Sequence, residues 1–404
     1  MNYSRNIKIY YYYSTFAELL ILGPILVLYL TAKGLSFAEI MALQSISAIG
    51  TFLFEVPTGA VADRIGRKHS IFLGAIIWAI SLLMYVVGKS YIIFIIAELT
   101  FSLGAAFKSG ADSALIYDSL KAEGREKEYQ GIEGKARAFA LYAQAIGSVV
   151  AGFVYEVNIF LPMIISSAFM IVTAFITLCF KEPPIEHQGS KAADTYFKQI
   201  YESGKHVLTH EKLKAIILYT MVFSIFYRAG FWYYQPYMET IKIPVRYFGI
   251  IFFIFNITAA FFSKRSSYIM EKTKPRTLTF MAFLMIASFA LMGVVKVWIG
   301  VLAILLQQVA RGINRPVFTK YMNKHIPSDK RATILSFQSL CCNIAVAVTF
   351  PFLGILKDHT NIFTNNLILA ASMTVLTLIT IKYMNSRLGL AHRGGKNKTE
   401  EAEV

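Results

Sequence analysis

The sequence predicts an all-α membrane protein with twelve transmembrane helices, and three observations support this fold class. Of the 404 residues, 56% are hydrophobic and only 16% are charged, whereas a soluble domain would carry about a quarter charged residues. The apolar residues come in blocks of roughly 20, which is long enough for a helix to cross a bilayer. These blocks do not alternate polar and apolar residues, as the strands of a membrane barrel would.

The blocks between charged clusters define twelve predicted spans. In chain order they are Tyr11–Leu30, Phe37–Ala60, Ser70–Val87, Tyr91–Ser119, Ala136–Val157, Phe160–Phe180, Ala215–Met238, Tyr247–Ser263, Leu278–Val295, Val297–Val317, Ala332–Leu356 and Ile362–Tyr383. A shift of 208 residues lays Gly59–Arg64 on Ser267–Lys272, which supports an internal duplication. We therefore expect two pseudo-symmetric six-helix bundles at residues 1–180 and 215–385. A polar linker at 181–214 would join them, and a charged tail would follow at 386–404.

Lysine and arginine gather in every second loop, and the formal net charge of the chain is +16. This distribution is the positive-inside pattern of a membrane protein, not the basic face of a nucleic-acid-binding protein. It predicts that both termini and the linker lie on the cytoplasmic side of a bacterial inner membrane, which agrees with an even number of spans. The cysteines Cys179, Cys341 and Cys342 lack zinc-ligand spacing, so we expect no metal and no cofactor.

A short basic turn lies between the second and third predicted spans, with the sequence Gly59-Ala-Val-Ala-Asp63-Arg64-Ile-Gly66-Arg67-Lys68. Gly59 would let the end of one helix approach a neighbour closely, and Gly66 would allow a tight turn. Asp63 at a membrane surface needs a cation or the positive N-terminus of a helix as its partner. The turn resembles the signature of the major facilitator superfamily, G-x-x-x-D-R-x-G-R-[RK], and every fixed position matches.

This resemblance implies the major facilitator fold and a cytoplasmic gate. Asp63 would face the start of span eleven, and Arg67 would pair with an acid at the cytoplasmic end of span four, where this sequence has Asp118. Such contacts would hold the cytoplasmic side closed while the binding site faces outward, and they would break when it opens. The alternative is a basic loop that sets the membrane topology and has no gating role.

Glu55-x-Pro57 precedes the turn and extends it to the form E-x-P-x5-D-x3-R-K. This form is similar to the variant signature of drug:proton antiporters, among them clostridial-type tetracycline efflux and macrolide-efflux-like proteins. It implies export coupled to protons. Span five lacks the Gly-Pro of the usual antiporter signature, which leaves import as an alternative.

Six charged residues lie away from the ends of the predicted spans, and all of them fall on spans one, four, seven and ten: Glu18, Glu98, Lys108, Asp112, Arg228 and Arg311. A charge near the bilayer centre costs about 3 kcal/mol or more, so those retained usually face a cavity or a partner. The resemblance implies that these four helices line a central cavity. Glu18 and Glu98 are the main candidates to carry a proton, with Asp112 and Glu55 as further candidates.

Several of these charges also have a simpler interpretation. Lys108 and Asp112 are four residues apart, so they would share a helix face and could neutralise each other. Glu18 and Glu98 could form fixed ion pairs with Arg228 or Arg311 instead of carrying protons.

Candidate substrate contacts are aromatic, cationic and polar side chains within the spans: Tyr227, Arg228, Arg311, Lys108, Gln144, Asn256 and Gln307. The arginines could hold an anionic group, whereas a single polar side chain more often joins helices to each other. The aromatic cluster Phe231–Tyr234 could suggest drug binding, but the run Trp232–Tyr237 lies toward the outer end of span seven, where interfacial belts gather tryptophan and tyrosine. We therefore interpret this run as a belt rather than a binding surface.

The sequence contains no G-x-x-x-x-G-K-[ST] phosphate loop, so an ion gradient is the expected energy source and an enzyme is not expected. The pattern favours a monomeric secondary transporter that exchanges protons for an amphipathic, drug-like compound by alternating access. Its expected partners are the small-molecule substrate, protons and the lipid bilayer. The alternatives are an importer of a small polar solute and a receptor or scaffold that keeps the fold without transport.

Overall fold

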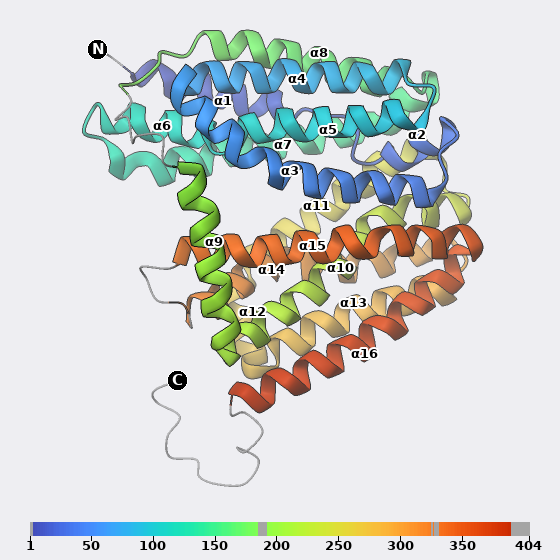
Figure 1. Cartoon of the computed structure of the whole chain (residues 1–404). Helices are drawn as coiled ribbons and strands as arrows, with labels where there is room; N and C mark the ends of the chain where they lie inside the picture. The colour runs from blue at the N-terminus through green and yellow to red at the C-terminus, as the bar shows by residue number, and fades with distance from the viewer. Residues whose placement is uncertain (1–2, 185–191, 325, 327–330, 389–404) are drawn as a thin grey trace.

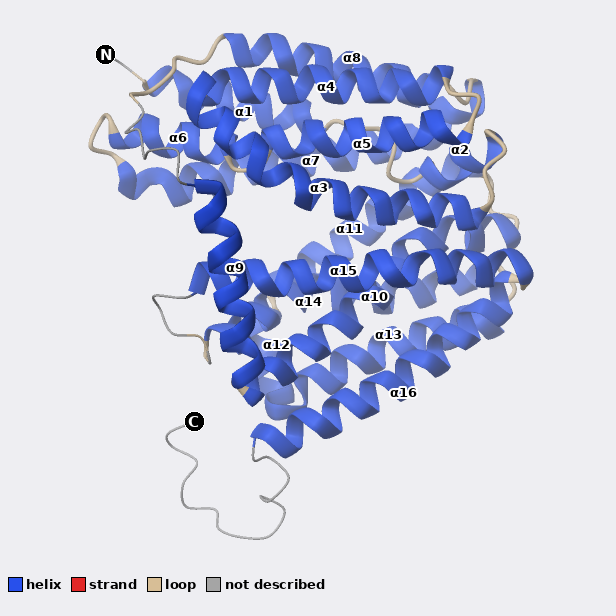
Figure 2. Cartoon of the chain, in the orientation of Figure 1, coloured by secondary structure: helices blue, strands red, loops and turns tan. Residues whose placement is uncertain are grey.

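The structure is a computed structural model that describes residues 3–184, 192–324, 326 and 331–388, and these residues form helices and loops without a strand (Figure 2). The first bundle contains α1 (Ser4–Glu18), α2 (Leu26–Ala32), α3 (Phe37–Ile65), α4 (Arg67–Val87), α5 (Tyr91–Lys108), α6 (Ala111–Lys121), α7 (Tyr129–Val157) and α8 (Leu161–Leu178). The second contains α10 (Glu211–Thr240), α11 (Phe248–Lys264), α12 (Ser266–Thr273), α13 (Thr277–Val294), α14 (Val301–Asn323), α15 (Arg331–His359) and α16 (Ile362–Leu388). Figure 1 shows the two bundles packed against each other.

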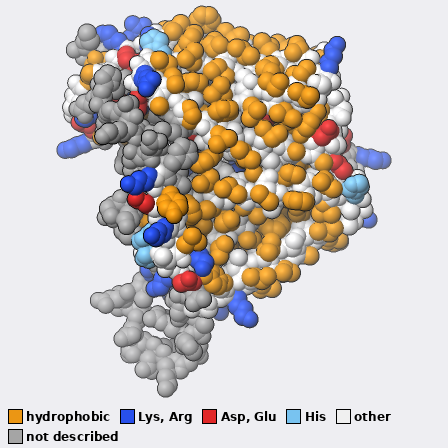
Figure 3. Space-filling view, in the orientation of Figure 1, with side chains coloured by type: hydrophobic (Ala, Val, Ile, Leu, Met, Phe, Trp, Pro, Cys, Tyr) orange, Lys and Arg blue, Asp and Glu red, His pale blue; other side chains and the backbone are white. Residues whose placement is uncertain are grey.

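Within the described residues, ten helices are long and apolar enough to cross a membrane. The predicted spans one and ten are not among these ten. Span one is divided between α1 and α2, and α14 carries Gln307, Gln308 and Arg311, which lower its hydropathy. Hydrophobic side chains cover the middle of the face shown in Figure 3, while charged side chains gather near its left and right edges. This surface suits a helix bundle that is surrounded by lipid.

A helix within the linker is the main feature that the sequence analysis missed. The interval expected to be a polar linker contains α9 (Ala192–Thr209), and α10 begins at Glu211, also inside that interval. Figure 1 shows α9 crossing from one bundle to the other, and it contacts both α3 and α15. The end of the molecule at which α9 lies, α1 begins and α16 ends is called the linker side below, and the opposite end the far side.

Two of the expected spans are broken near their middle. Span one leaves the helical conformation between Glu18 and Leu26, and span four breaks at Ser109–Gly110. Gly110 has a φ of +77°, a left-handed conformation that glycine adopts without steric cost.

The backbone released by the first break has polar side chains as partners. Gln235 Oε1 accepts from the Val27 amide at 2.9 Å, and Gln235 Nε2 donates to the Gly23 carbonyl at 2.9 Å. The Ile21 amide donates to the Ser166 hydroxyl at 3.1 Å. A break in lipid is tolerated because the protein satisfies these groups itself. Since Gln235 lies on α10, it also joins the two bundles.

Further hydrogen bonds join the two bundles on the far side. Asp358, at the end of α15, accepts from the backbone amides of Phe37 at 3.1 Å and Ala38 at 2.7 Å, the first residues of α3. Glu156, at the end of α7, accepts from the Arg246 amide at 3.0 Å. The described conformation is therefore one in which the bundles are held together on the far side.

Candidate transport cavity and gate

A cavity of about 330 Å³ lies between the two bundles. The first bundle contributes Gln44, Tyr85, Glu98, Phe101 and Gln144, among others. The second contributes Phe231, Trp232, Phe252, Asn256 and Arg311. Its walls are mostly apolar and aromatic and carry a few polar groups, which is the usual character of a small-molecule site.

Glu98 is the acidic group of this cavity. It lies on α5, its residue is only 6% exposed, and the Tyr85 hydroxyl of α4 donates to its Oε2. Among the described residues no lysine or arginine pairs with it. The expected alternative, a fixed ion pair with Arg228 or Arg311, is wrong for this conformation because both arginines bind neutral amides instead.

Arg311 is the basic group of the cavity. Its Nη1 donates to the side-chain oxygens of Asn256 at 3.1 Å and Gln308 at 3.2 Å. Gln308 Nε2 in turn donates to the Tyr234 hydroxyl at 3.1 Å, and that hydroxyl donates to Gln307 Oε1 at 2.8 Å. This chain of neutral groups fixes the position of the guanidinium without neutralising its charge.

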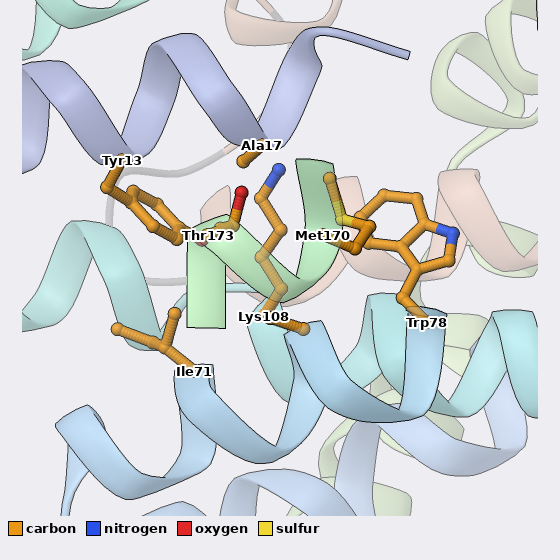
Figure 4. A pocket seen from close by; sticks show the side chains of 8 residues that line it. Tyr13, Ala17, Ile71, Trp78, Lys108, Met170 and Thr173 are labelled. Carbon is orange, nitrogen blue, oxygen red and sulfur yellow. The ribbon is translucent and has the colours of Figure 1, made fainter. Parts of the chain in front are cut away.

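Glu18 and Lys108 form an ion pair where the two broken helices meet. Lys108 Nζ lies 2.9 Å from Glu18 Oε1, and both side chains are mostly shielded from solvent. Figure 4 shows Lys108 extending from α5 toward Ala17, between Thr173 and Met170. The indole ring of Trp78 also lies beneath this ammonium group, 5.4 Å from Nζ to the ring centroid.

The alternative in which Lys108 and Asp112 pair on one helix face is wrong for this conformation, in which Lys108 pairs with Glu18. The break at Ser109–Gly110 ends α5 directly after Lys108, so the two side chains do not share a continuous helix. Asp112 instead accepts a 3.4 Å hydrogen bond from the Tyr13 hydroxyl and one of 2.7 Å from the Ser113 amide in the first turn of α6. Neither Asp112 nor Glu18 lines the larger cavity, and Glu55 has an exposed side chain outside it.

The predicted substrate contacts divide into two groups. Gln144, Asn256 and Arg311 line the larger cavity, whereas Tyr227, Arg228, Gln307 and Lys108 do not. Arg228 binds Asn343 Oδ1 at 2.8 Å.

The interpretation of Trp232–Tyr237 as an interfacial belt is wrong. Phe231 and Trp232 face the cavity, and Tyr233 and Tyr234 are buried inside the bundle. These aromatic side chains do not face lipid, because α10 packs against several helices of its own bundle.

The basic turn after α3 depends on a residue outside the motif. Gly66 has a φ of +92°, as a tight turn requires. Glu182, from the predicted linker, accepts from the backbone amides of Arg67 at 2.7 Å and Lys68 at 2.9 Å. A carboxylate in this place satisfies free amides and favours the positive N-terminus of α4.

Of the other motif residues, Arg67 has its expected partner, whereas Asp63 has none in the described part of the chain. Arg67 Nε lies 3.0 Å from Asp118 Oδ2, an ion pair between α4 and α6 within the first bundle. Asp63 and Arg64 have exposed side chains, and within the described residues Asp63 has neither a hydrogen bond nor an ion pair. The start of span eleven follows residues 327–330, which lie outside the described residues. Among the described residues the expected close approach at Gly59 is not made in this conformation, since a side chain there would meet none of their atoms within 4 Å.

The fold and the cavity are those of one class of protein: a multi-pass helical membrane transporter with a cavity between two bundles. The sequence profile of the Major Facilitator Superfamily matches residues 11–388, and the chain belongs to this superfamily. Both the predicted fold class and the predicted family are thereby confirmed, and members of this family are transporters rather than enzymes.

Curated relatives and solved structures agree with this assignment. The uncharacterized MFS-type transporter YxaM of Bacillus subtilis is 25% identical over 336 residues, covering 79% of this chain and 80% of YxaM. The quinolone resistance protein NorA of Staphylococcus aureus is 22% identical over 290 residues, covering 69% and 70%. The crystal structure of the nucleoside transporter NupG has a TM-score of 0.80 at 16% identity and covers 94% of this chain and 99% of NupG.

Proposed function

We propose that the protein is a proton-coupled exporter of amphipathic, drug-like compounds in a bacterial inner membrane, and that it acts as a monomer. The observation that carries this proposal is the cavity between the bundles, in which aromatic side chains surround one buried carboxyl group, Glu98. Such walls suit a ligand that is mostly apolar and carries a polar group. The similarity to NorA, a quinolone resistance protein, supports export of a drug-like compound.

Glu98 is the proposed proton carrier. A carboxylate in an apolar wall carries a high free-energy cost as an anion, and either a proton or a cationic ligand group removes that cost. A proton and a cationic substrate would therefore compete for the same carboxyl group. That competition couples the inward movement of one to the outward movement of the other. Glu18 has a secondary role in this proposal because Lys108 already compensates its charge.

The linker side is the proposed cytoplasmic side, because the loops rich in lysine and arginine lie there. The far-side contacts of Asp358, Glu156 and Gln235 then close the outer side of the cavity. On this assignment the described conformation is the one that receives substrate from the cytoplasm.

We assign separate roles to the two acids of the proposed gate. Arg67 and Asp118 lie in the same bundle, so their ion pair keeps α4 and α6 together as one body and does not hold the bundles to each other. Asp63, at the end of α3, is the residue proposed to reach the second bundle when the linker side closes. This division replaces the expectation that both contacts form and break together.

Transport by inverted membrane vesicles tests the proposal. A proton gradient should drive the accumulation of dyes, tetracyclines or macrolides and should dissipate as they move. Glu98→Gln should abolish uphill accumulation while substrate exchange without a gradient continues, because the neutral side chain still allows binding but takes up no proton. Glu126→Gln is the matched control, since Glu126 is an exposed acid at a distance from the cavity.

Three outcomes would contradict parts of this proposal. If no compound moves with the gradient, the protein is not such an exporter, and uptake of a polar solute by intact cells would support the importer instead. If neither export nor uptake occurs, a receptor or scaffold is favoured. If Glu98→Gln still pumps uphill, another group carries the proton.

A further inference from the structure

The cavity presents two opposite charges from opposite bundles. Glu98 belongs to α5 of the first bundle, and Arg311 belongs to α14 of the second. They do not form an ion pair with each other, and aromatic side chains line the space that they share. An occupant of this space meets an acid on one wall and a base on the other.

One edge of the Arg311 guanidinium, formed by Nε and Nη2, makes no hydrogen bond with the described residues. Only Nη1 makes hydrogen bonds among the described residues, both to neutral amide oxygens, so Nε and Nη2 remain without acceptors. These two nitrogens form the edge that holds a carboxylate through two parallel hydrogen bonds. A guanidinium that is half removed from water and has no anion is costly, and an anionic ligand group removes that cost.

Gln44 adds a second free donor to the same cavity. Its Nε2 is buried and has no hydrogen-bond partner among the described residues. Buried donors in native proteins nearly always have an acceptor, and one that lacks it in a cavity points to a ligand. A carbonyl or carboxylate oxygen of the occupant would satisfy it.

We propose that the cavity binds zwitterionic amphipaths: flat, largely apolar molecules that carry both a carboxylate and an amine. The carboxylate binds the free edge of Arg311, the ammonium group binds Glu98, and the ring system lies against Phe231, Trp232 and Phe252. This inference rests on the proposed function in one respect only, namely that the cavity is the transport site. It narrows the substrate class from amphipathic compounds in general to those with both charges.

Binding by three related compounds tests this substrate class directly. Ciprofloxacin carries a carboxylate and a secondary amine on a fused ring, its methyl ester lacks the carboxylate, and its N-acetyl derivative lacks the basic amine. Equilibrium dialysis against the purified protein in nanodiscs, read by the fluorescence of each compound, gives the three affinities. The parent compound should bind about tenfold or more tightly than either derivative, because each derivative loses a charge-assisted contact.

Variants assign each preference to its residue. Arg311→Gln should remove the difference between acid and ester, and Glu98→Gln should remove the difference between amine and amide. Arg315→Gln is the matched control, because Arg315 lies on the same helix with an exposed side chain and does not line the cavity. It should keep both preferences. The comparison in the unchanged protein needs no variant, so a variant that fails to fold leaves the test intact.

The inference is overturned if ester and acid bind equally to the unchanged protein, if Arg311→Gln keeps the difference, or if none of the compounds binds. Its failure is distinguishable from failure of the proposed export. Selective binding without proton-driven transport would support the substrate class and refute proton-coupled export. Proton-driven transport of permanently cationic dyes, without any preference for the acid over the ester, would support proton-coupled export and refute the zwitterionic substrate class.

Discussion

Removing the Asp358 carboxylate should shift the protein toward a conformation that is open on the far side. Asp358 lies at the end of α15 and accepts hydrogen bonds from two amides at the start of α3, at 2.7 and 3.1 Å. This carboxylate therefore acts as an N-terminal cap that one bundle supplies to a helix of the other. The contact exists only while the far side is closed, so Asp358→Ala should destabilise that conformation alone.

The size of the shift follows from the geometry of the contact. Loss of a capping side chain costs about 0.5–2 kcal/mol, and a carboxylate at an exposed helix N-terminus contributes about 0.3–1 kcal/mol of that through the helix dipole. Because Asp358 is exposed, we take about 1 kcal/mol, which is roughly a fivefold change in the ratio of closed to open molecules.

Electron paramagnetic resonance distances between two spin labels measure this ratio. Lys89 and Lys296 are exposed residues of far-side loops in different bundles. Each can be replaced by a cysteine that carries a spin label, once the three native cysteines have been replaced by serine. The population with the longer distance should grow by about fivefold relative to the closed one in Asp358→Ala.

Glu39→Ala is the control for this measurement. Glu39 is also a carboxylate at the start of α3, but it bonds the Ser36 amide of its own bundle at 2.8 Å and completes a capping box there. Its loss should weaken the helix in both conformations equally. An unchanged distance distribution in Asp358→Ala, or an equal shift in Glu39→Ala, would refute the reasoning.

Three further changes test the gate and the ion pair. Gly66→Ala should cost about 1–3 kcal/mol of stability in thermal unfolding, since few other residues adopt the backbone conformation of Gly66. The control Gly59→Ala should cost little. Equal losses in the two variants would contradict a special backbone requirement at Gly66. Asp63→Asn should slow turnover in vesicle transport with little change in substrate affinity, and a large affinity loss would exclude a gating role. Lys108→Met should lower the unfolding temperature, and adding Glu18→Gln should recover much of the loss, because the unpaired carboxylate is then gone; no recovery would mean that the ion pair is not what Lys108 stabilises.

The positions and order of ten of the twelve spans could be predicted because hydropathy is a local property. Each apolar block and each charged loop reports on its own position in the membrane, as the blocks that became α3 and α13 show. The breaks in spans one and four could not be predicted in the same way. Their cause is tertiary: the released backbone after Glu18 is stable because Gln235 and Ser166, far away in the sequence, supply its hydrogen bonds.

Among the site residues, too, those with a local signal could be predicted and those that depend on tertiary contacts could not. Glu98 and Arg311 could be found because a charge inside an apolar block is conspicuous, whatever surrounds it. Two of their neighbours could not, since Tyr85 and Gln44 are ordinary residues until the helices meet. Glu182 could not be assigned from the sequence, because only the fold brings it to the first amides of α4.

The division of charge between the bundles has a mechanical consequence. In the alternating access proposed for this protein one bundle moves relative to the other, so the separation of Glu98 and Arg311 would change whenever the cavity changes the side to which it opens. A ligand that binds both residues has its highest affinity for the conformation in which that separation matches its own length, and it favours that conformation by the difference in affinity. A ligand with one charge binds a single bundle and lacks this effect. The rate of the conformational change, and not only affinity, should therefore distinguish a zwitterion from its ester.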